Sequence, residues 1–208
     1  MNSYTTIGTL AAAGVMAASL LGGTSVASAG ASAAPRGTAQ AQPAGHEISM
    51  AEFVARFGPK DPKAQARLLA SGFTIRNQHS RKCLDADPGQ SWDGGQVYLW
   101  ECNGAEWQRW TYGQDDDRLA FGAYDGRVLD AVLRNTNGSA ITRYRWRGWS
   151  DGGEWNQQWK FSSTGEIKSA WNGRCLDGDP AQSAPGTNPQ RTWLWDCNGE
   201  DWQKWEFV

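Results

Sequence analysis

Three aspartates have the clearest potential for chemistry, because each stands at the same place in a repeated motif: Asp85, Asp130 and Asp177. Two carboxylates on opposite sides of one bond could hydrolyse a glycoside by acid–base catalysis. Here the acids occur singly, once per repeat, and the chain has neither a His-Glu-x-x-His nor a phosphate-loop motif. The two histidines, His46 and His79, stand alone and are assigned no role. A protein that is not an enzyme and uses no metal or cofactor is therefore predicted.

The aspartates belong to a repeat whose most constant part is the tripeptide Gln-x-Trp. It occurs at residues 108–110, 157–159 and 203–205, so that successive copies begin 49 and 46 residues apart. A period of this size is typical of repeat architectures, in which one supersecondary unit cannot bury its apolar face alone. The predicted repeats cover residues 73–112, 113–161 and 162–208.

The first and third repeats share more than the tripeptide. Both contain Cys-Leu-Asp, then aromatic-Leu-Trp-x-Cys-Asn-Gly, then an acidic residue followed by Trp-Gln. The middle repeat is looser, since it has Val-Leu-Asp, Tyr-x-Trp and Trp-Asn-Gln at the matching places and no cysteine. Three copies are nevertheless the best count.

The alignment of the middle repeat raises a problem of register. Matching Tyr144 and Trp146 to the aromatic pairs of the other repeats places Arg143 and Arg145 at positions that point into the core if the strand alternates. Buried charges are costly, so a bulge or a slip of this alignment is expected. These two arginines and Arg147 could instead recognise acidic sugars or lie on an exposed charged strand.

Short runs rich in aromatic and β-branched residues, bounded by Gly, Asn, Asp or Pro, indicate strands throughout the repeats. The runs are residues 73–75, 97–100, 108–112, 128–131, 157–161, 192–195 and 203–207. About four strands in each of three repeats would make twelve, and a threefold arrangement lets a barrel close without exposed edges. The predicted fold is therefore an all-β β-trefoil over residues 73–208.

The residues before the repeats have a different composition. Residues 7–21 form an apolar run that is too short to span a membrane comfortably, and an Ala-x-Ala pattern follows at 27–29. A secretory signal peptide is predicted over residues 1–29, although no Lys or Arg precedes Arg36. Residues 30–45 are rich in Ala, Gly and Pro and are predicted to be a disordered linker.

Residues 46–72 are predicted to be a short helical segment. Ser49 with Glu52 has the spacing of a capping box, and Asp61 followed by Pro62 can begin a second helix. This segment either packs beside the repeats or is a pro-segment that is removed on maturation.

Four cysteines lie in the outer repeats, namely Cys83, Cys102, Cys175 and Cys197. In a secreted chain an even number of cysteines indicates disulfides, although sequence alone permits three connectivities. Pairing within each repeat, Cys83 with Cys102 and Cys175 with Cys197, is favoured. Free thiols or a Cys₄ zinc site are the alternatives, but no Cys-x-x-Cys spacing is present.

The three copies of these motifs together resemble the ricin B-type lectin domains and the related carbohydrate-binding modules of secreted glycosidases. The resemblance covers residues 73–208. It implies a β-trefoil with one shallow sugar pocket per repeat, in which Asp accepts hydrogen bonds from adjacent hydroxyls and an aromatic ring stacks on the sugar. An Asn beside the Gln of the tripeptide completes the family's pocket. A carboxylate and a flat ring suit the hydroxyls and the C–H face of a pyranose.

Carried onto this sequence, the resemblance implies up to three carbohydrate-binding sites. The implied residues are Asp85, Tyr98, Trp100 and Gln108 in the first repeat, Asp130, Tyr144, Trp146, Asn156 and Gln157 in the second, and Asp177, Trp193, Trp195 and Gln203 in the third. The Gln and Trp of the tripeptides also have a purely structural interpretation, since Gln can satisfy loop backbone and Trp can fill the barrel. Trp107 and Trp202 stand where the family often has Asn, so these pockets replace amide groups with rings.

These features predict a secreted, monomeric carbohydrate-binding protein for galactosyl- or xylosyl-type glycans or polysaccharides. Thirteen tryptophans also fit the alternative, a degenerate β-trefoil that binds or inhibits another protein through its Trp-rich surface. A net charge of −2 gives no general attraction for nucleic acid. The sequence does not identify the sugar, which loop residues 88–95 and 180–189 are expected to select.

Overall fold

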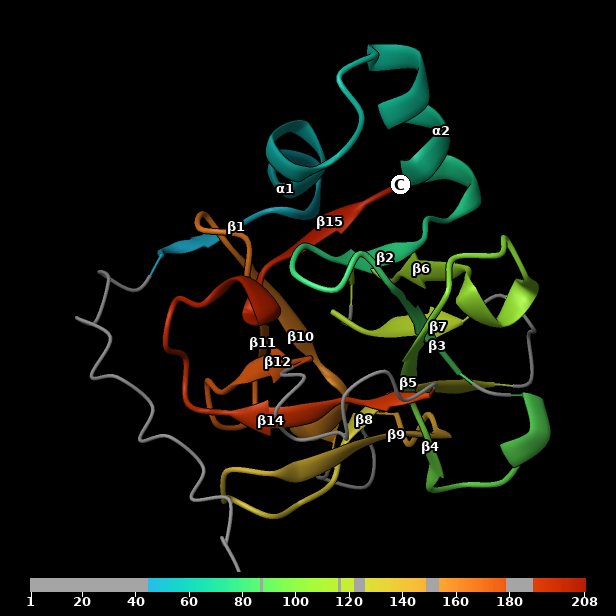
Figure 1. Ribbon diagram of the computed structural model, residues 1–208, viewed down its shortest axis with the longest axis vertical. Coiled ribbons are helices and arrows are strands. Elements are labelled where there is room, and N and C mark those ends of the chain that lie inside the picture. The colour runs from blue at the N-terminus through green and yellow to red at the C-terminus, as the bar shows by residue number, and fades with distance from the viewer. Residues whose placement is uncertain (1–44, 87, 116, 122–125, 149–153, 179–188) are drawn as a thin grey trace, which may run out of the picture. The chain divides into compact units, whose positions relative to one another are not determined.

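The computed structural model describes residues 45–208 apart from residues 87, 116, 122–125, 149–153 and 179–188. The predicted signal peptide and all but the last residue of the predicted linker lie outside the described residues, so both stay predictions. Within the described ranges, no helix is long and apolar enough to cross a membrane. The described chain begins with one short strand and two helices and continues as strands joined by turns and 3₁₀-helices (Figure 1).

Each repeat, called a lobe from here on, contributes four strands. Lobe 1 (residues 73–112) has β2 (Ile75–Asn77), β3 (Cys83–Asp85), β4 (Gly95–Gln96) with β5 (Tyr98–Trp100), and β6 (Trp110–Tyr112). Lobe 2 (residues 113–161) has β7 (Leu119–Phe121), β8 (Arg127–Ala131), β9 (Ser139–Arg145) and β10 (Trp159–Ser162). Lobe 3 (residues 162–208) has β11 (Ile167–Ser169), β12 (Cys175–Asp177), β13 (Gln190–Arg191) with β14 (Trp193–Trp195), and β15 (Trp205–Phe207). Counting β4 with β5 and β13 with β14 as single interrupted strands, the described residues contain the twelve that were predicted.

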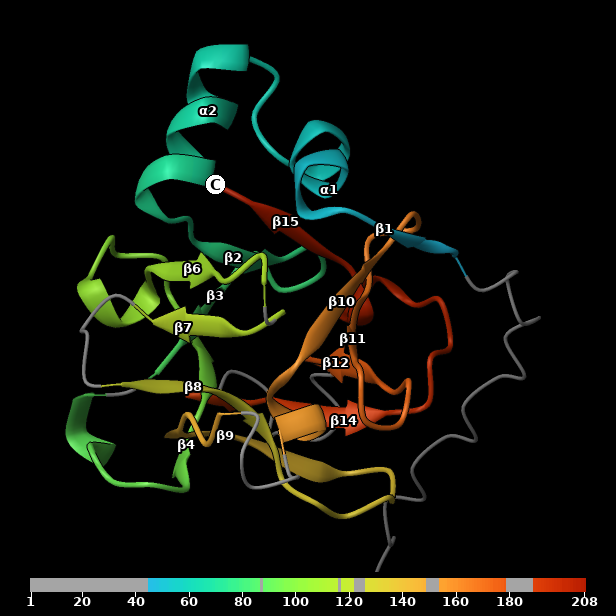
Figure 2. The ribbon, with the colours of Figure 1, turned by 180° about the vertical axis from the view of Figure 1, so that it is seen from behind.

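The strands pair so that the three lobes close on one another. β15 pairs antiparallel with β2, which joins the last strand of the repeats to the first. β14 pairs with β9, β13 with β5, and β4 with β9, so each lobe is hydrogen-bonded to both others. The view from behind in Figure 2 shows the same strands curling around a common interior. This closure confirms the predicted β-trefoil.

The tryptophans of the three tripeptides form the centre of the core. Each is fully buried, and each donates its indole N–H to a leucine carbonyl of the strand that carries the aspartate. The three hydrogen bonds run from Trp110 to Leu84 at 3.0 Å, from Trp159 to Leu129 at 3.0 Å, and from Trp205 to Leu176 at 3.1 Å. A buried indole N–H is costly unless it is bonded, so these carbonyls allow a large ring to fill the barrel.

Two disulfides cross-link the outer lobes. Cys83 is bonded to Cys102 and Cys175 to Cys197, so the predicted pairing within each repeat is confirmed, and the alternatives of free thiols or a zinc site are wrong. Each bond connects the strand of the aspartate to the end of the strand that pairs with it. Lobe 2 has no such bond because it has no cysteine.

The register of lobe 2 corrects the alignment that was made on its aromatic residues. β8 pairs with β9 so that Asp130 faces Thr142, Leu129 faces Arg143 and Val128 faces Tyr144. In lobe 1, Asp85 faces Tyr98 and Cys83 faces Trp100. Tyr144 therefore stands at the place of Trp100, two residues away from the place that the aromatic pattern assigned to it.

Of the two arginines expected to conflict with the core, only one is buried. Arg143 stands opposite Leu129, is 2% exposed, and donates from Nε to the carbonyl of Gln90 at 2.7 Å. Arg145 has a side chain that is 72% exposed and lies 3.7 Å from a carboxylate oxygen of Asp93. The expected slip of alignment is thus confirmed, and the buried guanidinium is hydrogen-bonded, as burial requires.

The segment before the repeats packs on the barrel. β1 (Glu47–Ile48) pairs with β10, α1 (Met50–Phe57) follows, and α2 (Pro62–Ser71) leads into lobe 1. Ser49 and Asp61 cap the two helices, and Pro62 occupies the first turn of α2, as predicted. Figure 1 shows both helices at the end of the barrel where β15 runs.

A cluster of phenylalanines holds α1 in place. Phe53 is fully buried, and its ring centroid lies 4.9 Å from those of both Phe161 and Phe207. Phe73 stacks on Phe207 from the other side, with 4.3 Å between centroids. A helix that contributes a fully buried ring to this cluster is part of the core. Of the two possibilities left open by the sequence, packing against the repeats is what the structure shows, and removal on maturation stays a prediction.

Candidate functional site

The three aspartates occupy equivalent positions and are held by equivalent glutamines. In every lobe the Gln of the tripeptide donates from Nε2 to Oδ2 of the aspartate. The distances are 2.8 Å from Gln108 to Asp85, 2.9 Å from Gln157 to Asp130, and 2.7 Å from Gln203 to Asp177. The aspartates are only 5%, 4% and 1% exposed, and all three glutamines are fully buried.

A short 3₁₀-helix positions each glutamine. These turns are η2 (Glu106–Gln108), η4 (Glu154–Gln157) and η6 (Asp201–Gln203), and the tryptophan that follows each is anchored in the core. The amide of each glutamine also closes the preceding loop: Nε2 donates to the carbonyl of Glu101, Arg145 or Asp196, and Oε1 accepts from the backbone N–H of Asn103, Arg147 or Asn198.

We call this arrangement, made by the side chains of Gln108, Gln157 and Gln203, the glutamine latch. It satisfies the loop backbone and fixes one face of the aspartate at the same time. All three glutamines are fully buried and hold the aspartates, and their predicted contact with sugar stays a prediction.

Aromatic rings lie across the strand pair from the aspartates in the outer lobes. Asp85 faces Tyr98, and Asp177 faces Trp193. Residues two apart on a strand share a face, so Trp100 and Trp195 stand on the same face as their lobe's acid. Trp100 is 37% exposed. The register thus places the predicted acid and rings of lobe 1, and those of lobe 3, on one face of their strand pair.

The tryptophans beside the latch distinguish the outer lobes from the middle one. Trp107 and Trp202 directly precede the latch glutamines, at the place of Asn156 in lobe 2. In lobe 3 the indole nitrogens of Trp193 and Trp202 are buried and have no hydrogen-bond partner among the described residues. Lobe 3 therefore contains two donors that the described protein groups leave unused.

Lobe 2 surrounds its aspartate with polar groups. Asn156 donates from Nδ2 to Oδ2 of Asp130 at 3.0 Å and to the carbonyl of Ala131 at 2.9 Å. Arg147 donates from Nη2 to the same carboxylate oxygen at 3.4 Å and to Oδ1 of Asn156 at 2.9 Å. Burial raises the pKa of the Asp130 carboxyl above its ordinary value, while the bond from Gln157, the charge of Arg147 and the bond from Asn156 oppose that rise.

The two rings predicted for lobe 2 have different surroundings. The guanidinium carbon of Arg147 lies 5.1 Å from the ring centroid of Tyr144, within the range of a cation–π contact. Trp146 instead has the guanidinium of Arg118 over its ring at 5.3 Å. Tyr144 is therefore the ring associated with Asp130, and Trp146 belongs to a different surface.

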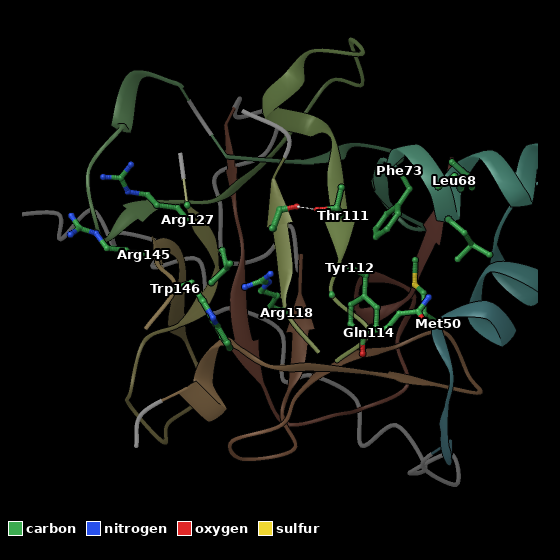
Figure 3. A pocket seen from close by; sticks show the side chains of 17 residues that line it. Met50, Leu68, Phe73, Thr111, Tyr112, Gln114, Arg118, Arg127, Arg145 and Trp146 are labelled. Carbon is green, nitrogen blue, oxygen red and sulfur yellow. Dashed lines mark hydrogen bonds between the residues drawn. The ribbon is translucent and has the colours of Figure 1, made fainter. Parts of the chain in front are cut away.

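That surface borders a cavity of about 720 Å³. Figure 3 shows Met50, Leu68 and Phe73 toward one end of it and Arg127 and Arg145 at the other, with Arg118 and Trp146 between them. None of the three aspartates lines this cavity. It lies between the helical segment and β6 to β8, so it is separate from the latched acids.

No other chemistry is assembled in the described part of the chain. Within it, no three His, Cys, Asp or Glu side chains group closely enough to hold a metal ion. Residues 148–152 match Gly-x-Ser-x-Gly, a string missed in the sequence prediction and mostly outside the described residues. Ser150 lies outside the described residues, so no catalytic role is assigned to this string. The two histidines have other neighbours: Nδ1 of His46 lies 3.2 Å from the hydroxyl oxygen of Ser163, and His79 packs edge-on against Trp202.

Comparison with known proteins agrees with this architecture. The family model of the ricin-type β-trefoil lectin domain matches residues 71–205. No curated protein matches the sequence.

Three solved structures illustrate the likeness. The designed threefold symmetric protein ThreeFoil is 23% identical, with a TM-score of 0.55 over 65% of this chain and 96% of its own. A non-toxic homologue of type II RIPs from Momordica charantia (bitter gourd), solved with α-methyl-D-galactoside, is 18% identical, with a TM-score of 0.53 over 65% of this chain and 46% of its own. A mutant C-terminal domain of the earthworm lectin, solved with 6′-sialyllactose, is 18% identical, with a TM-score of 0.52 over 65% and 97%. At these identities the likeness is one of fold.

Proposed function

The chain belongs to the ricin-type β-trefoil lectin family, and from its latched aspartates we propose that it is a secreted, non-catalytic protein that binds galactosyl- or xylosyl-type glycans. The observation that carries the proposal is the repetition of one arrangement: an aspartate fixed from inside by a glutamine and faced across the strand pair by a ring. Two of the related structures, from bitter gourd and earthworm, were solved with sugars bound.

The latch suits the carboxylate for recognising hydroxyl groups. A carboxylate has about four lone-pair positions, so an acid bonded from below by glutamine can also accept from two adjacent hydroxyls of a ligand. Such charge-assisted bonds are stronger than bonds between neutral groups. Because the glutamine is fixed by its own loop, the acid is oriented before the ligand arrives, and little ordering entropy is lost on binding.

Lobes 1 and 3 are the proposed sites. Each places two aromatic residues of one strand on the face of its acid, and a ring can stack on the C–H face of a pyranose. Asp85 and Asp177 are only 5% and 1% exposed, so sugar binding is expected to require a shift of neighbouring side chains that uncovers the carboxylates. Affinity of one shallow pocket is expected to be weak, on the order of millimolar. Two pockets on one body raise the effective affinity for a polymer that carries many sugars.

A glycan array and pull-down with insoluble polysaccharides would test the proposal on the full chain. We expect binding to a galactosyl or xylosyl ligand that falls in the single variants Asp85→Ala and Asp177→Ala and is lost in the double variant. Asp115→Ala is the matched control, since it removes an exposed carboxylate from a turn outside the lobes' acid sites. A folded protein that binds no galactosyl, xylosyl or glucosyl ligand, or a double variant that binds as well as the wild type, would show the proposal to be wrong.

A second function is favoured by a different observation. Trp92 and Trp155 are 56% and 60% exposed, and Trp107 and Trp202 replace the polar residue that lobe 2 keeps beside its acid. Exposed tryptophans are enriched at protein interfaces. If the array is negative, a protein partner bound through Trp92 and Trp155 is the alternative. This alternative predicts that Trp92→Ala and Trp155→Ala lose binding of the protein partner, while Asp85→Ala binds it as well as the wild type does.

Secretion is part of the proposal and has its own support. Two disulfides form and persist in oxidising compartments and are rare in the cytosol. The first residue of the protein recovered from culture medium, read by N-terminal sequencing, tests the predicted removal of residues 1–29. Recovery of a chain that still begins at Met1 would contradict it.

A further inference from the structure

The side chain of Arg147 makes all the contacts in lobe 2 that a sugar would be expected to make. We propose that Arg147 is an internal occupant of the lobe 2 pocket, which excludes neutral sugars from this lobe and leaves binding to lobes 1 and 3. The inference rests on the proposed carbohydrate binding and specifies which of the three pockets can take part.

The contacts of Arg147 coincide with the expected contacts of a sugar. A bound pyranose would donate to the acid, bond the amide next to the latch glutamine, and stack on a ring. Nη2 of Arg147 donates to Asp130 at 3.4 Å and to Asn156 at 2.9 Å, and its guanidinium lies 5.1 Å from the ring centroid of Tyr144. A guanidinium is planar, carries several N–H donors and stacks on aromatic faces, so it can satisfy all three partners at once.

The backbone of Arg147 is placed by the same latch that orders the other lobes. Its N–H donates to Oε1 of Gln157 at 3.3 Å, as the N–H of Asn103 donates to Gln108 and that of Asn198 to Gln203. The three residues therefore make the same backbone bond to their latch glutamine, although ten residues separate Arg147 from Gln157 and five separate each asparagine from its glutamine.

The asparagines of the outer lobes bond the backbone of their own loops. Oδ1 of Asn103 accepts from the backbone N–H of Ala105 at 2.9 Å, and Oδ1 of Asn198 accepts from that of Glu200 at 3.0 Å. Both side chains are thus used within their own loop. The longer, charged side chain of Arg147 in lobe 2 reaches the acid instead.

Occupation by Arg147 competes directly with a ligand. All three aspartates are buried to a similar extent, so the block in lobe 2 comes from the contacts of Arg147, whose side chain is 30% exposed and donates to Asp130. A neutral sugar can bond Asp130 only after Arg147 has left. The apparent affinity of a site falls in proportion to the fraction of molecules in which it is open, and an open fraction below about one tenth weakens binding at least tenfold.

The decisive variants are Arg147→Ala and Arg147→Asn. The first removes the guanidinium, and the second replaces it with the side chain that makes the equivalent backbone bond in the outer lobes. Arg145→Ala is the matched control, because it removes the same charge two residues away from a side chain that is 72% exposed and bonded to Asp93. Sugar titrations followed by NMR of the tryptophan and tyrosine signals would count the occupied lobes in the full chain.

We expect the wild type and Arg145→Ala to show no sugar-dependent shift of Tyr144, and both Arg147 variants to gain one that disappears when Asp130→Ala is added. The affinity gained in lobe 2 should be at least about tenfold over the wild type. A Tyr144 signal that responds to sugar in the wild type would overturn the inference. So would Arg147 variants that gain no lobe 2 binding while lobes 1 and 3 still bind.

A second measurement separates this inference from the proposed function. Ethylguanidinium should bind the pocket of Arg147→Ala, shift the Tyr144 signal and raise the melting temperature, with no such effect on the wild type or on Arg145→Ala. If no variant binds sugar but ethylguanidinium binds in this pattern, carbohydrate binding is wrong and the occupation of the pocket by Arg147 stands. If ethylguanidinium does not distinguish Arg147→Ala from the other two, the inference is wrong.

Discussion

Lobe 2 and the two outer lobes hold their aspartates by the same glutamine latch and surround them with different chemistry. In lobes 1 and 3 the neighbours of the acid are rings, and a disulfide joins the two strands beside it. In lobe 2 the neighbours are Asn156 and Arg147, and no disulfide is present. A repeated fold thus keeps the part that closes each loop and varies the part that faces solvent. Two things can be tested separately: whether the three lobes have equally stable cores, and whether the residues around Asp130 differ in effect from those around Asp85 and Asp177.

The largest effect is expected from removing the central tryptophans. Trp110→Ala, Trp159→Ala and Trp205→Ala should each lower the free energy of unfolding by about 3–5 kcal/mol, since each ring is fully buried. Urea unfolding with the disulfides intact would measure this. A much smaller loss at Trp159 than at the other two would show that lobe 2 has a looser core and would break the equivalence.

The disulfides should produce the next largest difference between the lobes. One variant changes both Cys83 and Cys102 to serine, and the other changes both Cys175 and Cys197. Each variant loses one disulfide, whose cysteines are 19 residues apart in the first case and 22 in the second. The expected loss is about 2–4 kcal/mol for each pair. Unfolding curves of the two variants compared with the wild type, with and without reductant, would measure it. Loss of stability below about 1 kcal/mol would mean that the rings and the latch already fix these loops.

Removing the latch should have a smaller effect that differs between lobes. Gln108→Ala and Gln203→Ala leave a buried carboxylate without its glutamine donor and are expected to cost about 1–3 kcal/mol. In Gln157→Ala, Asn156 and Arg147 still donate to Asp130, so a loss at the lower end of the same range is expected. Chemical denaturation of the three variants decides this. Equal losses in all three would show that the polar surroundings of Asp130 give it no extra support.

The smallest effect is a dependence on pH that belongs to lobe 2. Folding raises the pKa of Asp130, so the folded state binds this proton more tightly than the unfolded state. Its contribution to stability is therefore present at low pH and is lost as the pH rises through the raised pKa. Melting temperatures of the wild type and of Asp130→Asn, measured across the acidic range, should show the wild type losing stability relative to the variant as pH increases. A parallel profile would contradict the shift.

The fold could be predicted from the sequence because its signals are repeated. Gln108, Gln157 and Gln203 each precede a residue and then a tryptophan, and in every lobe this tryptophan fills the core while the glutamine closes a loop. The four cysteines lie two in the first repeat and two in the third, and this repetition favoured the disulfide pairing within each repeat that the structure has. Repetition works here because one physical constraint, a buried indole that needs a carbonyl, is imposed three times.

The site in lobe 2 could not be predicted in the same detail. Tyr144 and Trp146 imitate the aromatic pair of the other lobes, but the partner strand places Tyr144 opposite Val128, which only strand pairing reveals. The role of Arg147 depends on a side chain that reaches across the loop, and no spacing in the sequence indicates that reach. The helical segment was recognised from its caps, while the burial of Phe53 against lobes 2 and 3 was not.

The position of α1 affects where this protein can be cut. Residues 71–205 match the family model, but Phe53 fills a space among Phe161, Phe207 and Phe57, and β1 extends the sheet at β10. A fragment that begins at the family boundary would expose aromatic rings and one strand edge to water, and both promote self-association. A fragment that folds on its own is therefore expected to begin upstream of Glu47, because the chain carries part of its hydrophobic core ahead of its repeats.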